Sequence, residues 1–430
     1  MAYDNWDRSI IWLHKQPLFL WQIALSYKIF GVSEFSLRLP SALMSGLMII
    51  FGYRSGRIFI NKRVGFYTAF LFSTSFYMIE LISGRQQVDH NDIAFLFYVS
   101  ASIWAWCEYI YTGKKYWIIF IGVFSGCSIL CKWFAGLLVY SGWFIYSVIS
   151  NKSEIKKYKD ILLSFIVTVI IVLPWQIFIF CKYPTEANYE FNYNSRHFSQ
   201  ALEGHGGDAW THFDNIGIMY GKLVPFILLF GFILLYKKIE NKRLRIAFVS
   251  FTFFVYLFYT LAKTKMLSYP FVAALPVFMS LACIMDFMFS KIELLKIRRL
   301  MVAIILFFVI IFTGYINLDF QQIQGTHTLL KDENQYSKML MYNREVFLDI
   351  KDSLPRNSVL FNIKGQHYVE SMFYTGFPSY NLVPSVEQCN EVKKSGKVVV
   401  LFKNSDTDLP EYLKNDKSVI KLQRQLQGYD

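Results

Sequence analysis

The chain has 430 residues, of which 54% are hydrophobic and only 17% are charged, whereas a soluble domain usually carries about a quarter charged residues. The formal net charge of +13 lies mostly in short loops between long apolar blocks. Lysine and arginine in such loops flank transmembrane helices and meet anionic lipid headgroups. This placement excludes a soluble nucleic-acid-binding protein and indicates an integral membrane protein with no nucleic-acid partner.

The apolar blocks are long enough to form membrane-spanning helices. A bilayer core about 30 Å thick needs about 20 apolar residues per helix. By this rule we expect about ten spans, at 41–60, 64–83, 92–111, 116–131, 134–150, 161–181, 216–236, 246–262, 269–289 and 300–318. The fourth and fifth are short, with a turn near Lys132 between them. The predicted fold class is therefore mainly α, a polytopic membrane domain.

Lysine and arginine are distributed unequally between the predicted loops. They are concentrated around residues 57–63, 114–115, 152–159, 237–245 and 291–299, and the alternate loops are poorer. The positive-inside rule makes the rich side cytoplasmic. The N-terminal segment, the loop 182–215, the C-terminal tail and all seven histidines then face outward. Because an outward N-terminus is unusual, we expect one further helix upstream of Met1.

The two ends of the chain differ from the predicted membrane domain, residues 41–318. Within residues 1–40, the apolar stretch 8–31 is interrupted by polar residues and is expected to form helices that lie in the membrane interface. Residues 319–430 are predicted to be an extracytoplasmic domain. Strands are expected at 359–363, 397–403 and 418–422, and helices at 367–376 and 385–396. This alternation predicts a small α/β domain with parallel strands.

Ionisable residues near a bilayer surface are costly and are therefore candidates for function. Asp89, His90, Asn91 and Asp92, preceded by Arg85, crowd the start of the third predicted span. A helix N-cap at Asn91 or Asp92 is one explanation, but it accounts for a single residue and not for the group. A carboxylate here could act as a general base or bind a divalent cation.

Histidines and lysines mark the other outward clusters. His14 and Lys15 lie in the N-terminal segment, and His197 lies among acidic residues in the loop 182–215. The His, Glu and Asp side chains of this loop can bind a metal, although their spacing matches no zinc motif. Ordinary hydrogen bonding is the alternative. Lys132 stands alone at its turn, and Lys265 lies four residues before Tyr269. A lipid phosphate would offset these outward lysines, and snorkelling is the alternative.

Four sequence blocks carry a resemblance to a known family. They are HKQPLFLW (14–21) followed by FGVSEFSLRLPSAL (30–43), GRQQVDHND (84–92), CKWFAG (131–136) and KMLSYPFVAALP (265–276). In this order they resemble motifs of the lipid-phosphate-sugar glycosyltransferases of GT-C fold. That family includes the bacterial lipid A aminoarabinose transferase and the protein O-mannosyltransferases. The resemblance covers about residues 14–290, and the order of the blocks is more specific than any single block.

The resemblance implies an inverting glycosyltransferase on the outer face of a bacterial inner membrane. A lipid, glycan or protein acceptor attacks a sugar carried on a polyprenyl phosphate, while an aspartate removes the acceptor proton and cations hold the phosphate. The implied roles are catalytic for Asp89 or Asp92, phosphate-binding for Lys15, Arg38, Arg85, Lys132, Lys265 and Tyr269, and binding of a divalent metal for His197 and His14.

The chain departs from the family pattern at its N-terminus. The acidic pair of the family's first outer loop would precede Met1, and only Asp4 and Asp7 could substitute for it. His14 stands where some members have Glu, and Lys15-Gln16-Pro17 displaces a proline. Two other functions stay open. A flippase of lipid-linked sugars would need ionisable residues deep in the spans, for which Lys222 and Asp286 are the candidates, and a non-catalytic subunit is the third possibility.

Overall fold

The computed structural model describes residues 11–83, 91–149, 155–292, 300–302, 304–305, 308, 334–363, 365, 367–403 and 409–427. The chain divides into two compact units. The first, called the membrane unit here, consists of Trp12–Ile29 and Phe35–Asp319. The second, called the C-terminal unit, consists of Phe320–Asp430 with Met1–Ile11 and Phe30–Glu34.

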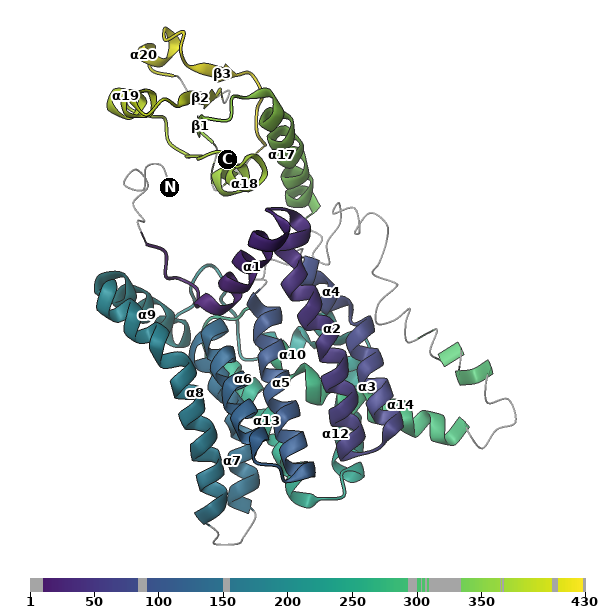
Figure 1. Cartoon of the computed structure of the whole chain (residues 1–430). Helices are drawn as coiled ribbons and strands as arrows, with labels where there is room; N and C mark the ends of the chain where they lie inside the picture. The colour runs from purple at the N-terminus through teal and green to yellow at the C-terminus, as the bar shows by residue number, and fades with distance from the viewer. Residues whose placement is uncertain are drawn as a thin grey trace. The chain divides into compact units, whose positions relative to one another are not determined.

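Helices make up the membrane unit (Figure 1). They are α1 (Pro17–Phe30), α2 (Glu34–Phe59), α3 (Lys62–Thr74), α4 (Phe76–Ser83), α5 (Asn91–Thr112), α6 (Tyr116–Lys132), α7 (Tyr140–Ile149), α8 (Ile155–Lys182), α9 (Pro184–Ser199), α10 (Thr211–Asp214), α11 (Ile216–Tyr220), α12 (Val224–Lys238), α13 (Lys242–Leu261) and α14 (Ala274–Ile292). Two short 3-10 helices, η2 (Trp133–Val139) and η3 (Tyr269–Ala273), lie between α6 and α7 and before α14.

The predicted spans coincide with apolar helices. Among the described residues, six helices are long and apolar enough to cross a membrane, or up to eight if two bent helix pairs each count as a span. The bent pairs are α3 with α4 and the stretch Thr211–Tyr220 with α12. The predicted fourth and fifth spans share the stretch Tyr116–Ile149, and the predicted span 300–318 lies largely outside the described residues. The polytopic, mainly helical fold is confirmed.

The spans differ in how deeply the protein buries them. In the most apolar window of α5, 83% of the residues are buried, and in that of the stretch Tyr269–Lys291 the share is 89%. In α8 only 11% are buried, so this helix leaves most of its apolar surface for lipid. Helices α5 and α14 therefore form the centre of the membrane unit, and α8 lies at its edge.

The C-terminal unit contains a small parallel sheet, as predicted. Strands β1 (Ser358–Phe361), β2 (Val398–Phe402) and β3 (Ile420–Leu422) lie in the order β1-β2-β3, with Val359 paired to Val399 and Val400 to Ile420. Because alternate strand residues point to opposite faces, two cores form. One packs on α19 (Val386–Lys394) and the other on α17 (Asn334–Ser353). Helices α18 (His367–Thr375) and α20 (Glu411–Lys414) complete the unit.

Candidate active site

A cavity of about 330 Å³ lies within the membrane unit. It is bounded by the segment before α1, the adjoining ends of α5 and α6, η2, α9 and the link from α13 to η3. Its polar lining residues are His14, Lys15, Gln16, Asn91, Lys132, Asn194, Ser195, His197 and Glu203. Its other lining residues are Cys131, Trp133, Phe134, Ala135, Phe191, Phe198, Phe258, Tyr259, Ala262, Met266 and Tyr269. The volume is at the lower end of the range for small-molecule sites.

Lys132 reaches this cavity because α6 ends abruptly after it. The next residue, Trp133, has φ 49° and ψ −150°, a conformation that is strained for a residue with a side chain. The chain then turns back against α6. The backbone of Gly136 lies so close to Ile129 on α6 that a Cβ added to the glycine would be only 2.7 Å from Ile129. Asn91 Nδ2 donates to the carbonyl of Cys131 at 2.6 Å and ties the start of α5 to this turn.

The Lys132 ammonium contacts residues from two other segments, α5 and the start of η3. Lys132 Nζ forms an ion pair with Asp92 Oδ1 near the start of α5. The second oxygen of Asp92 accepts a hydrogen bond of 2.5 Å from Ser268 Oγ. Lys132 Nζ also lies 4.6 Å from the ring centroid of Tyr269, which favours a cation. Asp92 and Ser268 are each only 5% exposed, whereas the Lys132 side chain is 20% exposed.

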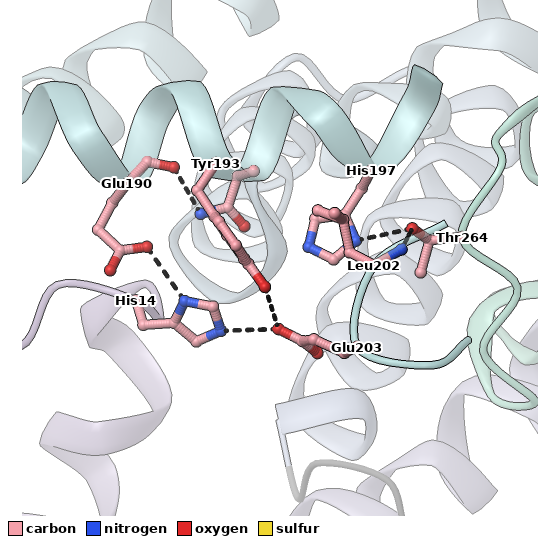
Figure 2. Close-up of polar contacts among 8 residues, drawn as sticks. His14, Glu190, Tyr193, His197, Leu202, Glu203 and Thr264 are labelled. Carbon is pink, nitrogen blue, oxygen red and sulfur yellow. Dashed lines mark hydrogen bonds and ion pairs between the residues drawn. The ribbon is translucent and has the colours of Figure 1, made fainter. Parts of the chain in front are cut away.

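His14, which lines the cavity, lies between two carboxylates (Figure 2). His14 Nδ1 is 3.0 Å from Glu190 Oε2, and Nε2 is 3.6 Å from Glu203 Oε1. Tyr193 donates to the same Glu203 oxygen at 3.0 Å. Both ring nitrogens therefore face carboxylates, which is an arrangement of ion pairs and hydrogen bonds. Figure 2 shows Glu190 and Tyr193 on α9 and His14 on the segment before α1.

His197 is held by Thr264 on the link between α13 and η3. The Thr264 hydroxyl donates to the carbonyl of Gln200 at 2.9 Å and accepts from the Leu202 N–H at 3.3 Å. The 3.0 Å contact between His197 Nδ1 and Thr264 Oγ1 therefore assigns the imidazole proton to Nδ1. Nε2 is left as the acceptor nitrogen of the ring.

Burial lowers the pKa of His197, and the nearby His14, Lys15 and His205 lower it further, against an opposing effect of Glu203. The unfolded chain then binds this proton more readily, so acidification through about pH 6.5 costs stability. We expect His197→Gln to reduce the fall in Tm between about pH 7 and 5. Thermal unfolding of wild type and His197→Gln in detergent, at a series of pH values, measures this. An unchanged pH dependence in His197→Gln would contradict the prediction.

The described residues hold no group of three or more His, Cys, Asp or Glu side chains that is arranged to bind a metal ion. His14 and His197, the predicted metal ligands, both line the cavity. Their rings instead face Glu190, Glu203 and Thr264. These contacts give His14 and His197 hydrogen-bonding and electrostatic roles.

The other predicted site residues fall into three groups. Lys15 and Tyr269 line the cavity with Lys132. Arg38 and Lys265 are absent from its described lining. Arg38 donates to the carbonyl of Ser83 at 3.0 Å, and Lys265 donates to the carbonyl of Tyr259 at 2.9 Å. Asp89 and Arg85 lie outside the described residues, as do Asp4 and Asp7.

Sequence reasoning missed two contributors to this site. Ser268 was not singled out, although it directly precedes Tyr269 in KMLSYP, and its hydroxyl engages Asp92. Trp133 was passed over as an ordinary apolar residue. No local sequence pattern marks the positive φ of Trp133.

Part of the chain is similar in sequence to known glycosyltransferases. Residues 14–178 match the family described as dolichyl-phosphate-mannose-protein mannosyltransferase. The chain is 30% identical over 152 residues to an uncharacterized protein of Aquifex aeolicus (strain VF5), covering 34% of this chain and 29% of the relative. It is 24% identical over 272 residues to an undecaprenyl phosphate-alpha-4-amino-4-deoxy-L-arabinose arabinosyl transferase of Pseudomonas fluorescens (strain Pf0-1), covering 60% of this chain and 45% of the relative.

A solved structure shares the fold over most of the chain. The crystal structure of ArnT from Cupriavidus metallidurans bound to undecaprenyl phosphate has a TM-score of 0.66 at 13% identity, covering 89% of this chain and 78% of ArnT. The chain spans less than half the length of the curated relatives it matches. The predicted resemblance to GT-C-fold glycosyltransferases is confirmed at the level of the fold and the family match.

Proposed function

We propose that this chain, which has the GT-C fold, transfers a sugar from a polyprenyl phosphate to an acceptor at the outer face of a bacterial inner membrane. The observation that carries the proposal is the Lys132 ammonium in the cavity wall, between the buried Asp92 and the ring of Tyr269. A cation held in a partly apolar cavity suits the phosphate of a lipid-linked donor.

The cavity combines the two properties that such a donor requires. Lys132 and Lys15 supply positive charge, which would stabilise the phosphate as it leaves the sugar. Aromatic side chains such as Phe134, Phe191 and Phe258 supply apolar surface, which suits the first units of a prenyl chain. ArnT was crystallised with undecaprenyl phosphate, which supports a donor of this class.

The proposed reaction is a single inverting displacement. The acceptor oxygen, on a lipid, glycan or protein, forms a bond to the anomeric carbon while the bond from that carbon to the phosphate oxygen breaks. A carboxylate takes the acceptor proton, and the cations hold the departing phosphate. Asp92 is buried, pairs with Lys132 and is absent from the described cavity lining, so Asp89 is the favoured base among the two predicted carboxylates.

The test is transfer of labelled sugar in membranes that contain wild-type protein. Membranes are supplied with undecaprenyl phosphate carrying labelled mannose or 4-amino-4-deoxy-arabinose, and loss of the lipid-linked label is followed. We expect Lys132→Met to lower transfer about 10²-fold or more, as for other transition-state charge contacts. Lys182→Met is the matched control, because Lys182 also lies over aromatic rings, of Phe178 and Tyr183, outside the cavity lining.

Two outcomes would contradict the proposal. If the label changes leaflet without leaving its lipid, the protein is a flippase. If wild type and Lys132→Met transfer label equally, the cavity is not the donor site.

A further inference from the structure

We infer that Asp92 is a positioning residue, which holds the Lys132 ammonium in place for the donor phosphate, and is not the base that accepts the acceptor's proton. The inference deepens the proposed function and rests on it for the identity of the phosphate ligand. It concerns the one predicted catalytic carboxylate that the structure describes.

Each carboxylate oxygen of Asp92 already has one partner. Oδ1 pairs with Lys132 Nζ, and Oδ2 accepts the 2.5 Å hydrogen bond from Ser268 Oγ. A carboxylate oxygen can accept two hydrogen bonds, but a general base must also lie within hydrogen-bond reach of the proton it removes. Asp92 is 5% exposed and is not among the described side chains that line the cavity. Lys132, its ion-pair partner, does line the cavity.

Lys132 has a particular need for such a partner. It is the last residue of α6, and the strained turn at Trp133 follows it directly. A lysine side chain has several rotatable bonds and extends toward water when nothing holds it. Asp92 and the Tyr269 ring hold the ammonium from two sides. Asp92 is in turn fixed by Ser268, so the charge is presented at one defined place.

This arrangement makes a different prediction from base catalysis. Without the carboxylate, the Lys132 ammonium is no longer held in one position, and it contacts the donor phosphate for a smaller fraction of the time. The effect of changing Asp92 should therefore pass entirely through Lys132. A base would instead act on the acceptor, and its loss would be independent of Lys132 and of donor binding.

A double-mutant cycle tests this on the full-length protein in detergent. The dissociation constant of undecaprenyl phosphate is measured for wild type, Asp92→Asn, Lys132→Met and the double variant. We expect Lys132→Met to weaken binding about 10- to 100-fold, since a hydrogen bond to a charged group is lost. We expect Asp92→Asn to weaken it about 10-fold in the wild-type background and to have no further effect beside Lys132→Met. Uncharged undecaprenol should bind all four proteins equally.

The pH dependence of transfer supplies a second readout. If Asp92 only positions Lys132, Asp92→Asn retains the acidic limb of the pH–rate profile, because the base is another group. Glu108→Gln is the matched control, since Glu108 is 3% exposed and forms an ion pair with Arg54 remote from the cavity lining. It should change neither binding nor the pH profile of the folded protein.

Two results would overturn the inference. One is an effect of Asp92→Asn on undecaprenyl phosphate binding that persists in full beside Lys132→Met. The other is loss of the acidic limb with unchanged binding, which would make Asp92 the base. If wild type binds undecaprenyl phosphate but transfers no sugar, the proposed function fails, and the binding cycle still decides the role of Asp92.

Discussion

Replacing Asp89 by asparagine is expected to lower sugar transfer about 10²- to 10⁴-fold, the usual contribution of a general base. Asparagine keeps the size of the side chain but cannot accept the acceptor's proton at a carboxylate. Asp89 lies outside the described residues, so this prediction comes from the sequence, combined with the burial of Asp92 outside the described cavity lining. The measurement is loss of label from the lipid-linked donor at saturating donor concentration, together with the dissociation constant of undecaprenyl phosphate.

The comparison with Asp92→Asn makes the prediction specific. We expect Asp89→Asn to lower kcat and leave binding of undecaprenyl phosphate unchanged, whereas Asp92→Asn should weaken that binding. Lys182→Met serves as the control for expression and membrane insertion, because Lys182 is exposed at the end of α8. Full transfer by Asp89→Asn would rule out Asp89 as the base. A carboxylate of the cavity lining, such as Glu203, would then be the candidate base.

Much of the architecture follows from the sequence, because it depends on local patterns. Membrane spans are set by length and hydropathy, and the predicted spans up to 269–289 fall on the observed apolar helices. The three parallel strands of the C-terminal unit were also located correctly, from their β-branched runs. The turn after Lys132 was predicted from the short apolar blocks on either side of it, and the positive φ of Trp133 makes that turn.

The contacts of the candidate site depend instead on residues that are distant in sequence. Asp92 and Ser268 are separated by 176 positions, as are His14 and Glu190. Helix packing alone decides which of several outward polar residues meet, so hydropathy could indicate the side of the membrane expected for a residue but not its partner. The sequence likewise does not show that Lys265 and Arg38, which resemble phosphate ligands, donate to backbone carbonyls.

Among the predictions made here, the replacement of Gly122 by alanine is expected to change stability most. Helix α6 carries Gly122 and Gly126 one turn apart, and both face α8. A Cβ added to Gly122 would meet the carbonyl oxygen of Ser164 and lie 2.7 Å from Val167 Cβ, and one added to Gly126 would lie 2.7 Å from Ile171 Cβ. Small residues at this spacing allow membrane helices to approach closely. The hydrogen bond of 3.0 Å from Thr168 Oγ1 to the Gly122 carbonyl depends on the same approach.

We therefore expect Gly122→Ala to destabilise the protein by about 1–3 kcal/mol, the usual cost of overpacking, since backbone and not a flexible side chain must move. Gly46→Ala on α2 is the matched control, because a Cβ there meets nothing within 4 Å, and alanine favours the helix by up to about 1 kcal/mol. Thermal unfolding in detergent should show a lower Tm for the first variant and an unchanged or higher Tm for the second. Since α6 ends at Lys132, separation of α6 from α8 should also weaken binding of undecaprenyl phosphate. Equal Tm values for both variants would show that the α6–α8 contact tolerates a wider spacing than the structure indicates.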